Sequence, residues 1–170
     1  IDVEKLKLDI GKIESTAERI AKIVKGLRTF SRDSKGDPLM CESVQGMVHE
    51  VLDLARERFK NHEVDLQVNI KDEVHVLCRS QQFGQVLLNL VNNAHDAVVN
   101  LPEKWVRIEV KRAGNAARIS VVDSGNGIAP QVAMKMMNPF FTTKDVGKGT
   151  GLGLSISKGI AEDHGGRLVY

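Results

Sequence analysis

The N-terminal segment carries a heptad pattern that it cannot satisfy alone. Apolar residues recur at alternating intervals of three and four from Val3 to Leu27, with charged residues between them. This spacing predicts one helix with a narrow apolar seam, which needs partner helices to cover it. We therefore expect a helical hairpin or a bundle here, and the alternative is one long helix packed on its own domain.

The whole chain has the composition of a soluble protein. Of its 170 residues, 42% are hydrophobic and 27% are charged, and the net charge is only +2. This balance argues against nucleic-acid binding by electrostatics, and 4% aromatic residues disfavour a stacking platform. Cys41 and Cys78 are expected to be free thiols, which favours a reducing, cytoplasmic location. Contact with a membrane would come only from other segments of a longer parent chain, because no apolar run is long enough to span one.

A polar linker separates the heptad helix from the rest of the chain. Gly36 and Pro38 lie within it, and both residues break regular structure. We expect residues 1–33 to form the helix, residues 34–42 the linker, and residues 43–170 a second domain whose C-terminal strand is truncated. Since the first residue is not Met, the sequence is expected to be a fragment.

The second domain shows both helical and strand patterns. Ser43 is a candidate N-cap of an amphipathic helix, and the other predicted helices are 80–99, 131–137 and 151–164. Strands are expected where apolar residues alternate, at 64–70, 74–78, 106–110 and 117–122. The last two strands flank a hairpin turn at 113–115. These elements predict an α/β sandwich in which helices cover one face of a sheet.

Two polar motifs adjoin apolar elements and could hold a ligand. Asn89 and Asn93 stand one turn apart on a predicted helix, where amide oxygens could coordinate a hard cation such as Mg²⁺. A pair of surface asparagines is the alternative. Asp123 ends a strand just before Gly125 and Gly127, where a carboxylate could accept a hydrogen bond from an exocyclic amine. Such a segment is also a common turn.

Two further motifs could bind phosphate. Alternating glycines at residues 147–153 precede a helix, so their backbone amides could bind an anion, although a flexible linker is the alternative. The segment matches neither a Walker A loop nor a Rossmann fingerprint. Residues 139–144 read Pro-Phe-Phe-Thr-Thr-Lys, a segment that could clamp phosphate through its cation or simply pack as a loop.

In this order, the motifs resemble the ATP-binding domain of bacterial sensor histidine kinases. Residues 89–97 are similar to the N box, 123–127 to the first glycine box, 139–144 to the F box and 149–153 to the second glycine box. Residues 20–32 look like the second helix of the dimerisation and phosphotransfer hairpin.

The resemblance implies a fold, an activity and partners. The fold would be a two-layer α/β (α+β) sandwich of the Bergerat type, preceded by a long coiled-coil-like helix. The domain would bind ATP and Mg²⁺ under a lid and transfer the γ-phosphoryl group to a histidine of the hairpin. The partners would be a response regulator receiver domain and a second copy of the parent, joined through the hairpin.

The resemblance also implies a set of site residues. Asn93 would coordinate Mg²⁺, Asn89 would orient phosphate and metal-bound water, and Asp123 would bind the adenine amino group. Asp96 stands where many relatives carry a basic residue, so we expect Lys144 to face the phosphates and, with Asn89, to be catalytic. The other positions expected to contact the nucleotide are Asp96, Ala97, Gly125, Gly127, Ile128, Thr142, Thr143, Gly149, Thr150, Gly151, Leu152, Gly153 and Leu154.

Two other functions compete with the kinase interpretation. Related ATP hydrolases use a glutamate as general base one turn before the metal-binding asparagine, and Asn89 occupies that position here. Because an amide cannot take up a proton at neutral pH, the kinase is favoured over the hydrolase. The intact Asn93 and Asp123 argue against a non-catalytic scaffold. No histidine, His49 included, has the context of a phosphoacceptor, so the acceptor is expected outside this chain.

Overall fold

The computed structural model describes residues 38–145 and 149–170, together with seven helical residues between Lys7 and Ala17. The rest of the predicted heptad helix, and the first part of the predicted linker, lie outside the described residues. The chain divides into two compact units. The larger unit comprises Asp37–Ile128 and Ser157–Tyr170, and the smaller unit includes Ala129–Ile156.

A three-stranded mixed sheet forms one layer of the larger unit. Its strands are β2 (Asp65–Ile70), β4 (Trp105–Ala113) and β5 (Ala116–Asp123), in the order β2-β4-β5. Strand β2 runs parallel to β4, whereas β4 and β5 form the predicted hairpin around Gly114, whose φ is +66°. Over the first six residues of β4, every second residue (Val106, Ile108 and Val110) is buried, because one face of the sheet points into the core.

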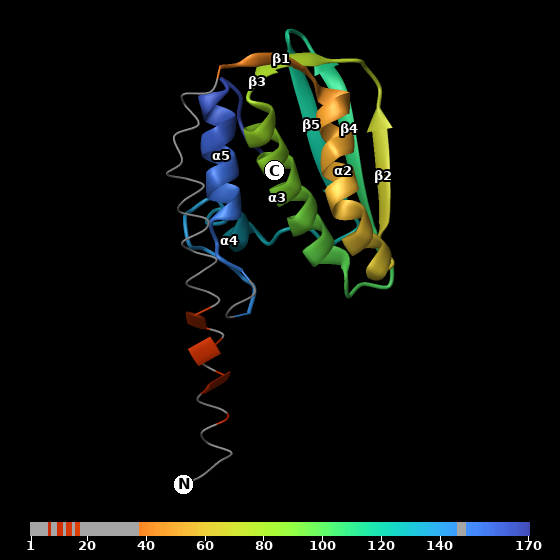
Figure 1. Ribbon diagram of the computed structural model, residues 1–170. Coiled ribbons are helices and arrows are strands. Elements are labelled where there is room, and N and C mark those ends of the chain that lie inside the picture. The colour runs from red at the N-terminus through yellow and green to blue at the C-terminus, as the bar shows by residue number, and fades with distance from the viewer. Residues whose placement is uncertain (1–6, 8–9, 12, 15, 18–37, 146–148) are drawn as a thin grey trace. The chain divides into compact units, whose positions relative to one another are not determined.

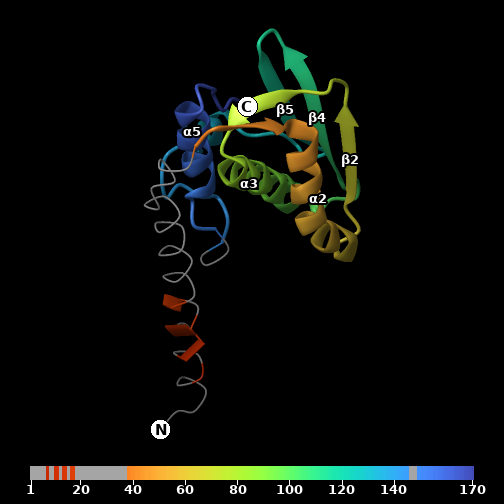
Figure 2. The same cartoon turned by 45° about the horizontal axis from the view of Figure 1, so that its top comes forward.

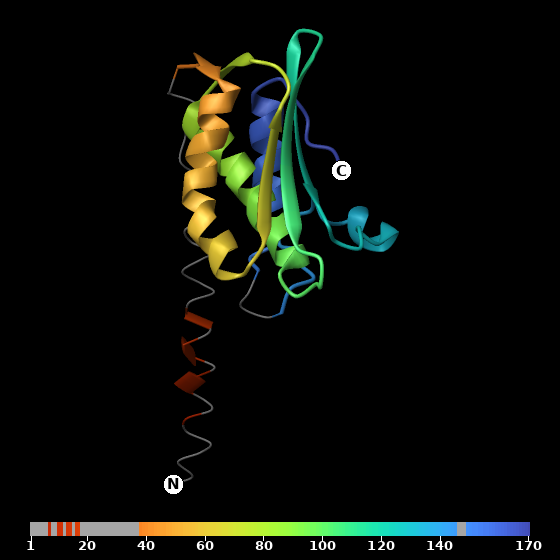
Figure 3. The same ribbon diagram turned by 90° about the vertical axis from the view of Figure 1, so that its right-hand side faces the viewer.

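Two helices cover that face and form the second layer. Helices α2 (Val44–Asn61) and α3 (Ser80–Val98) lie side by side against the sheet (Figures 1, 2 and 3). Ser43 caps α2 as predicted, since its Oγ accepts a hydrogen bond from the Gly46 amide. The core between the layers includes Phe59, Val91 and Ile108, each at most 1% exposed.

A second, two-stranded sheet joins the start of α2 to the start of α3. Strands β1 (Met40–Ser43) and β3 (His75–Cys78) pair antiparallel, with Met40 opposite Cys78. Strand β1 was not expected, because its first three residues were assigned to the linker and Ser43 to the N-cap of the following helix. Four residues with a mixture of apolar and polar side chains carry no readable period, so only their pairing with β3 makes them a strand.

Helix α5 (Gly153–Asp163) follows the glycine-rich segment, and its second half belongs to the larger unit. His164 ends this helix and accepts a hydrogen bond through Nε2 from the Arg79 amide, at 3.1 Å, beside the start of α3. In the smaller unit, α4 (Pro130–Ala133) is shorter than the predicted 131–137. Turns replace its last residues before Pro139.

Candidate functional site

The polar face of α3 carries both predicted asparagines. Asn89 Nδ2 donates a hydrogen bond to the hydroxyl of Ser157 at 3.3 Å, and Ser157 is fully buried on α5. Asn93 and Asp96 follow at intervals of four and three, so the three side chains share one face of the helix. All three are partly buried. The buried Ser157 therefore holds the side-chain amide of Asn89, the first of these three polar residues.

The end of β5 presents Asp123 from a tight turn. Its Oδ1 atom accepts a hydrogen bond from the Gly125 amide at 2.9 Å. A Cβ atom on Gly125 would lie 2.6 Å from that oxygen and 3.7 Å from Ala97 Cβ. A side chain at this position would displace the carboxylate, so the glycine keeps it in place. Three predicted site residues, Ala97, Asp123 and Gly125, thus lie together.

Ser124 braces this turn, and sequence analysis gave it no role. Its hydroxyl accepts a hydrogen bond from the Trp105 amide at 3.0 Å and donates one to the Glu103 carbonyl at 2.8 Å. The Ser124 amide also donates to the Trp105 carbonyl. Three hydrogen bonds therefore fix the backbone next to Asp123. No sequence signal distinguishes Ser124, because serine is common in turns.

The F-box-like and glycine-rich segments contact each other within the smaller unit. The Phe140 amide donates a hydrogen bond to the Gly151 carbonyl at 2.9 Å. Thr142 Oγ1 accepts from the Lys144 amide at 3.1 Å, and a Cβ on Gly149 would lie 2.6 Å from that oxygen. The glycines thus let two predicted phosphate-binding segments pack together. Part of the glycine-rich segment, residues 146–148, lies outside the described residues.

The remaining predicted positions differ in exposure. Ile128 is 51% exposed in the larger unit, where Gly127 before it has a φ of +78°. In the smaller unit, Leu152 is buried and its amide donates to Thr150 Oγ1 at 3.4 Å. Thr143 is exposed, whereas Gly153 and Leu154 are partly buried in the first turn of α5. Each unit therefore holds its own set of predicted residues.

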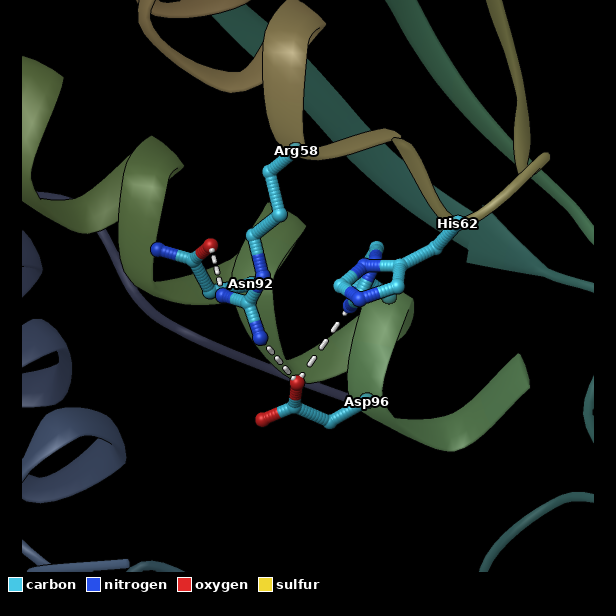
Figure 4. A network of polar contacts seen from close by, with 5 residues as sticks. Arg58, His62, Asn92 and Asp96 are labelled. Carbon is cyan, nitrogen blue, oxygen red and sulfur yellow. Dashed lines mark hydrogen bonds and ion pairs between the residues drawn. The ribbon is translucent and has the colours of Figure 1, made fainter. Parts of the chain in front are cut away.

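A polar network joins α2 to α3 and was missed by sequence analysis (Figure 4). Arg58 Nη1 donates to Asn92 Oδ1 at 2.7 Å, and Nη2 donates to Asp96 Oδ1 at 2.6 Å. The His95 ring, 1% exposed, lies 3.3 Å from the same Asp96 oxygen and 3.0 Å from His62 Nδ1. Burial lowers the pKa of His95, which favours its neutral form. No sequence pattern singles out Arg58, because its partners on α3 come near it only when α2 and α3 pack together.

The side chains of the described residues limit how a metal ion could be coordinated. Among the described residues, no group of three or more His, Cys, Asp or Glu side chains is placed to hold one. A hard cation at the polar face of α3 would therefore be coordinated by side-chain amide oxygens together with oxygens of a bound molecule. No helix in the described part of the chain is long and apolar enough to cross a membrane.

Comparisons with known proteins give consistent matches. Residues 78–170 match the family model of the histidine kinase-, DNA gyrase B- and HSP90-like ATPases. Sensor kinase CckA of Brucella abortus is 35% identical over 95% of this chain and 18% of its own length. The chain spans a quarter or less of the curated relatives CckA, PprA and a sensor protein of Shewanella frigidimarina.

Solved structures are also similar to this chain. The catalytic domain of histidine kinase ThkA has a TM-score of 0.66 at 33% identity, covering 74% of this chain and 81% of that chain. Histidine kinase ThkA in complex with the response regulator protein TrrA has a TM-score of 0.70 at 29% identity. That match covers 98% of this chain and 47% of the other.

Proposed function

Because the chain belongs to the histidine kinase-, DNA gyrase B- and HSP90-like ATPase family, we propose that it is the kinase part of a sensor histidine kinase. In this proposal it transfers the γ-phosphoryl group of ATP to a histidine on a phosphotransfer hairpin. The phosphoryl group then passes to a response regulator receiver domain. The similar ThkA has been solved in complex with a response regulator, which supports this partner.

The identity of residue 89 carries the choice of kinase over hydrolase. Asn89 stands one turn before Asn93 and donates a hydrogen bond to the buried Ser157. A general base that activates water must take up a proton, and an amide does not do so at neutral pH. The site therefore favours transfer to a supplied acceptor over transfer to water.

The residues of the larger unit fit a nucleotide and a metal ion. The Asn93 amide oxygen would hold Mg²⁺, which supplies charge neutralisation to the phosphates when bound. Asp123 would accept a hydrogen bond from the adenine amino group, and the missing side chain of Gly125 leaves room for the Asp123 carboxylate. Asp96, Ala97, Gly127 and Ile128 would line the same site.

The residues of the smaller unit would serve the phosphates. Lys144 is the cation proposed to face them, and the hydroxyls of Thr142 and Thr143 would donate hydrogen bonds. The backbone amides of the glycine-rich segment would add donors at the start of α5, where the helix dipole favours an anion. These positions are Gly149, Thr150, Gly151, Leu152, Gly153 and Leu154.

The proposal extends to the assembly of the parent protein. We expect residues 1–33 to complete a dimerisation hairpin with a preceding helix, so that two parent chains form a four-helix bundle. We also expect the domain to work in the cytoplasm, where ATP and response regulators are available.

Phosphoryl transfer in trans tests the proposed activity. The chain is mixed with γ-labelled ATP, Mg²⁺ and a separate hairpin protein that carries an acceptor histidine. We expect acid-labile label on the hairpin protein and none on the chain. Asn93→Ala should abolish the label, whereas Asn69→Ala, an exposed change on β2, should leave it intact. Acid-labile label on the chain itself, or phosphate release without transfer, would contradict the proposal.

A further inference from the structure

Arg58 connects the last turn of α2 to the polar face of α3. Its guanidinium group donates to Asn92 and Asp96, two residues one turn apart on α3. The side chains of Arg58 and Asp96 are 42% and 29% exposed, so the ion pair lies at the surface and not in the core. A pair in this position contributes little to folding and remains accessible to a ligand.

Asp96 lies on the face of α3 that also carries Asn89 and Asn93. A carboxylate three residues after Asn93 would stand beside the phosphates of a nucleotide held by these amides. Each phosphate of ATP is negative, and like charges a few ångströms apart repel each other strongly when partly shielded from water. Asp96 would therefore oppose a triphosphate unless a cation is held against it.

We propose that Arg58 is a positioning residue that pairs with Asp96 and so lets this end of α3 accept a triphosphate. The inference rests on the proposed function, because it takes the phosphates to lie against Asn89 and Asn93. Two hydrogen bonds, to Asn92 and to Asp96, fix the guanidinium group and keep its charge on the carboxylate. The His95 ring contacts the same Asp96 oxygen and limits its movement.

The effect of Arg58 should grow with the charge of the ligand. Arg58→Gln leaves Asp96 with one cation fewer, so we expect ATP affinity to fall about tenfold or more. The loss of affinity should be smaller for ADP and smallest for AMP, which carries the fewest phosphates. High salt should reduce the loss, because it screens the repulsion. Removal of the carboxylate in the double variant Arg58→Gln/Asp96→Asn should restore most of the ATP affinity.

Calorimetric titration with ATP, ADP and AMP, at low and high salt, measures these effects. Arg56→Gln is the matched control, because it removes the same charge from the same helix while Arg56 pairs with Asp53 at the surface. This control should bind ATP as the parent chain does. Arg58→Lys keeps the charge but not the two-point contact, so its affinity should be intermediate. Thermal unfolding of each variant verifies that it is folded.

The outcomes separate this inference from the proposed function. Failure of the parent chain to bind ATP would overturn both. ATP binding by the parent chain, with Arg58→Gln indistinguishable from Arg56→Gln, would overturn only the role of Arg58. Equal losses for ATP, ADP and AMP would mean a purely structural role. A double variant as weak as Arg58→Gln would mean that Arg58 contacts phosphate directly and does not act through Asp96.

Discussion

Asp123 depends on its neighbours for its place. The Gly125 amide holds one carboxylate oxygen, and Ser124 fixes the backbone to the start of β4. The motif of an aspartate with two glycines could be recognised in the sequence, since it follows an apolar strand. The bracing by Ser124 was not readable, because it depends on residues about 20 positions away that only the sheet brings near.

Asp123→Asn should weaken ATP binding about tenfold or more. A hydrogen bond to a charged acceptor contributes about 1.5–3 kcal/mol, and each 1.4 kcal/mol is a factor of about ten. Inosine triphosphate, which lacks the adenine amino group, should bind weakly to the parent chain. Asp123→Asn should lower its affinity only slightly further. Calorimetry with both nucleotides measures this coupling. Equal losses for ATP and inosine triphosphate would disprove the contact with the amino group.

The two cysteines should differ in reactivity although both are free. Cys78 is 4% exposed, with its Sγ 3.7 Å from Met47 Sδ, whereas Cys41 is exposed on β1. Burial, with a smaller effect of Glu42, raises the pKa of the Cys78 thiol. Because the thiolate is the nucleophile, iodoacetamide near neutral pH should modify Cys41 and spare Cys78. Mass spectrometry should find both modified in denaturant, and rapid native labelling of Cys78 would contradict its burial.

Among the secondary-structure elements, the long ones with regularly spaced apolar residues were predictable from the sequence. Helix α3 and the β4–β5 hairpin were expected because apolar residues recur along each and Gly114 marks the turn. Strand β1 was not expected, since an element of four residues carries no period, and the helix predicted at 131–137 covers only Pro130–Ala133. The Arg58 network also escaped prediction, because polar residues on two helix surfaces reveal no partner before the helices pack.

Gly151→Ala should destabilise the smaller unit. Gly151 has a φ of +68°, and a Cβ there would lie 2.4 Å from the Phe140 carbonyl carbon. A left-handed conformation costs an alanine about 1–2 kcal/mol, and the contact adds to this. Gly159→Ala in α5 is the control, with nothing within 4 Å of its Cβ, and should stabilise by about 0.5–1 kcal/mol. Urea denaturation followed by circular dichroism measures both, and equal effects would contradict the account.

For the molecule as a whole, the fold and the family were predictable from four ordered motifs. The structure and the comparisons confirm the ATP-binding sandwich of histidine kinase catalytic domains. The division into two compact units was not predictable, because the smaller unit interrupts the larger one between Ile128 and Ser157. Each of these units carries some of the predicted site residues.

The central claim is that the polar face of α3, with Asp123, forms a site for ATP and Mg²⁺. Calorimetric titration of ATP into the chain, with Mg²⁺ and with a chelator, tests it most directly. We predict that Mg²⁺ strengthens ATP binding to the parent chain and to Asn69→Ala, and that Asn93→Ala loses this gain because its amide oxygen is the proposed ligand. Absence of ATP binding by the parent chain, or a Mg²⁺ gain that Asn93→Ala keeps in full, would contradict the account.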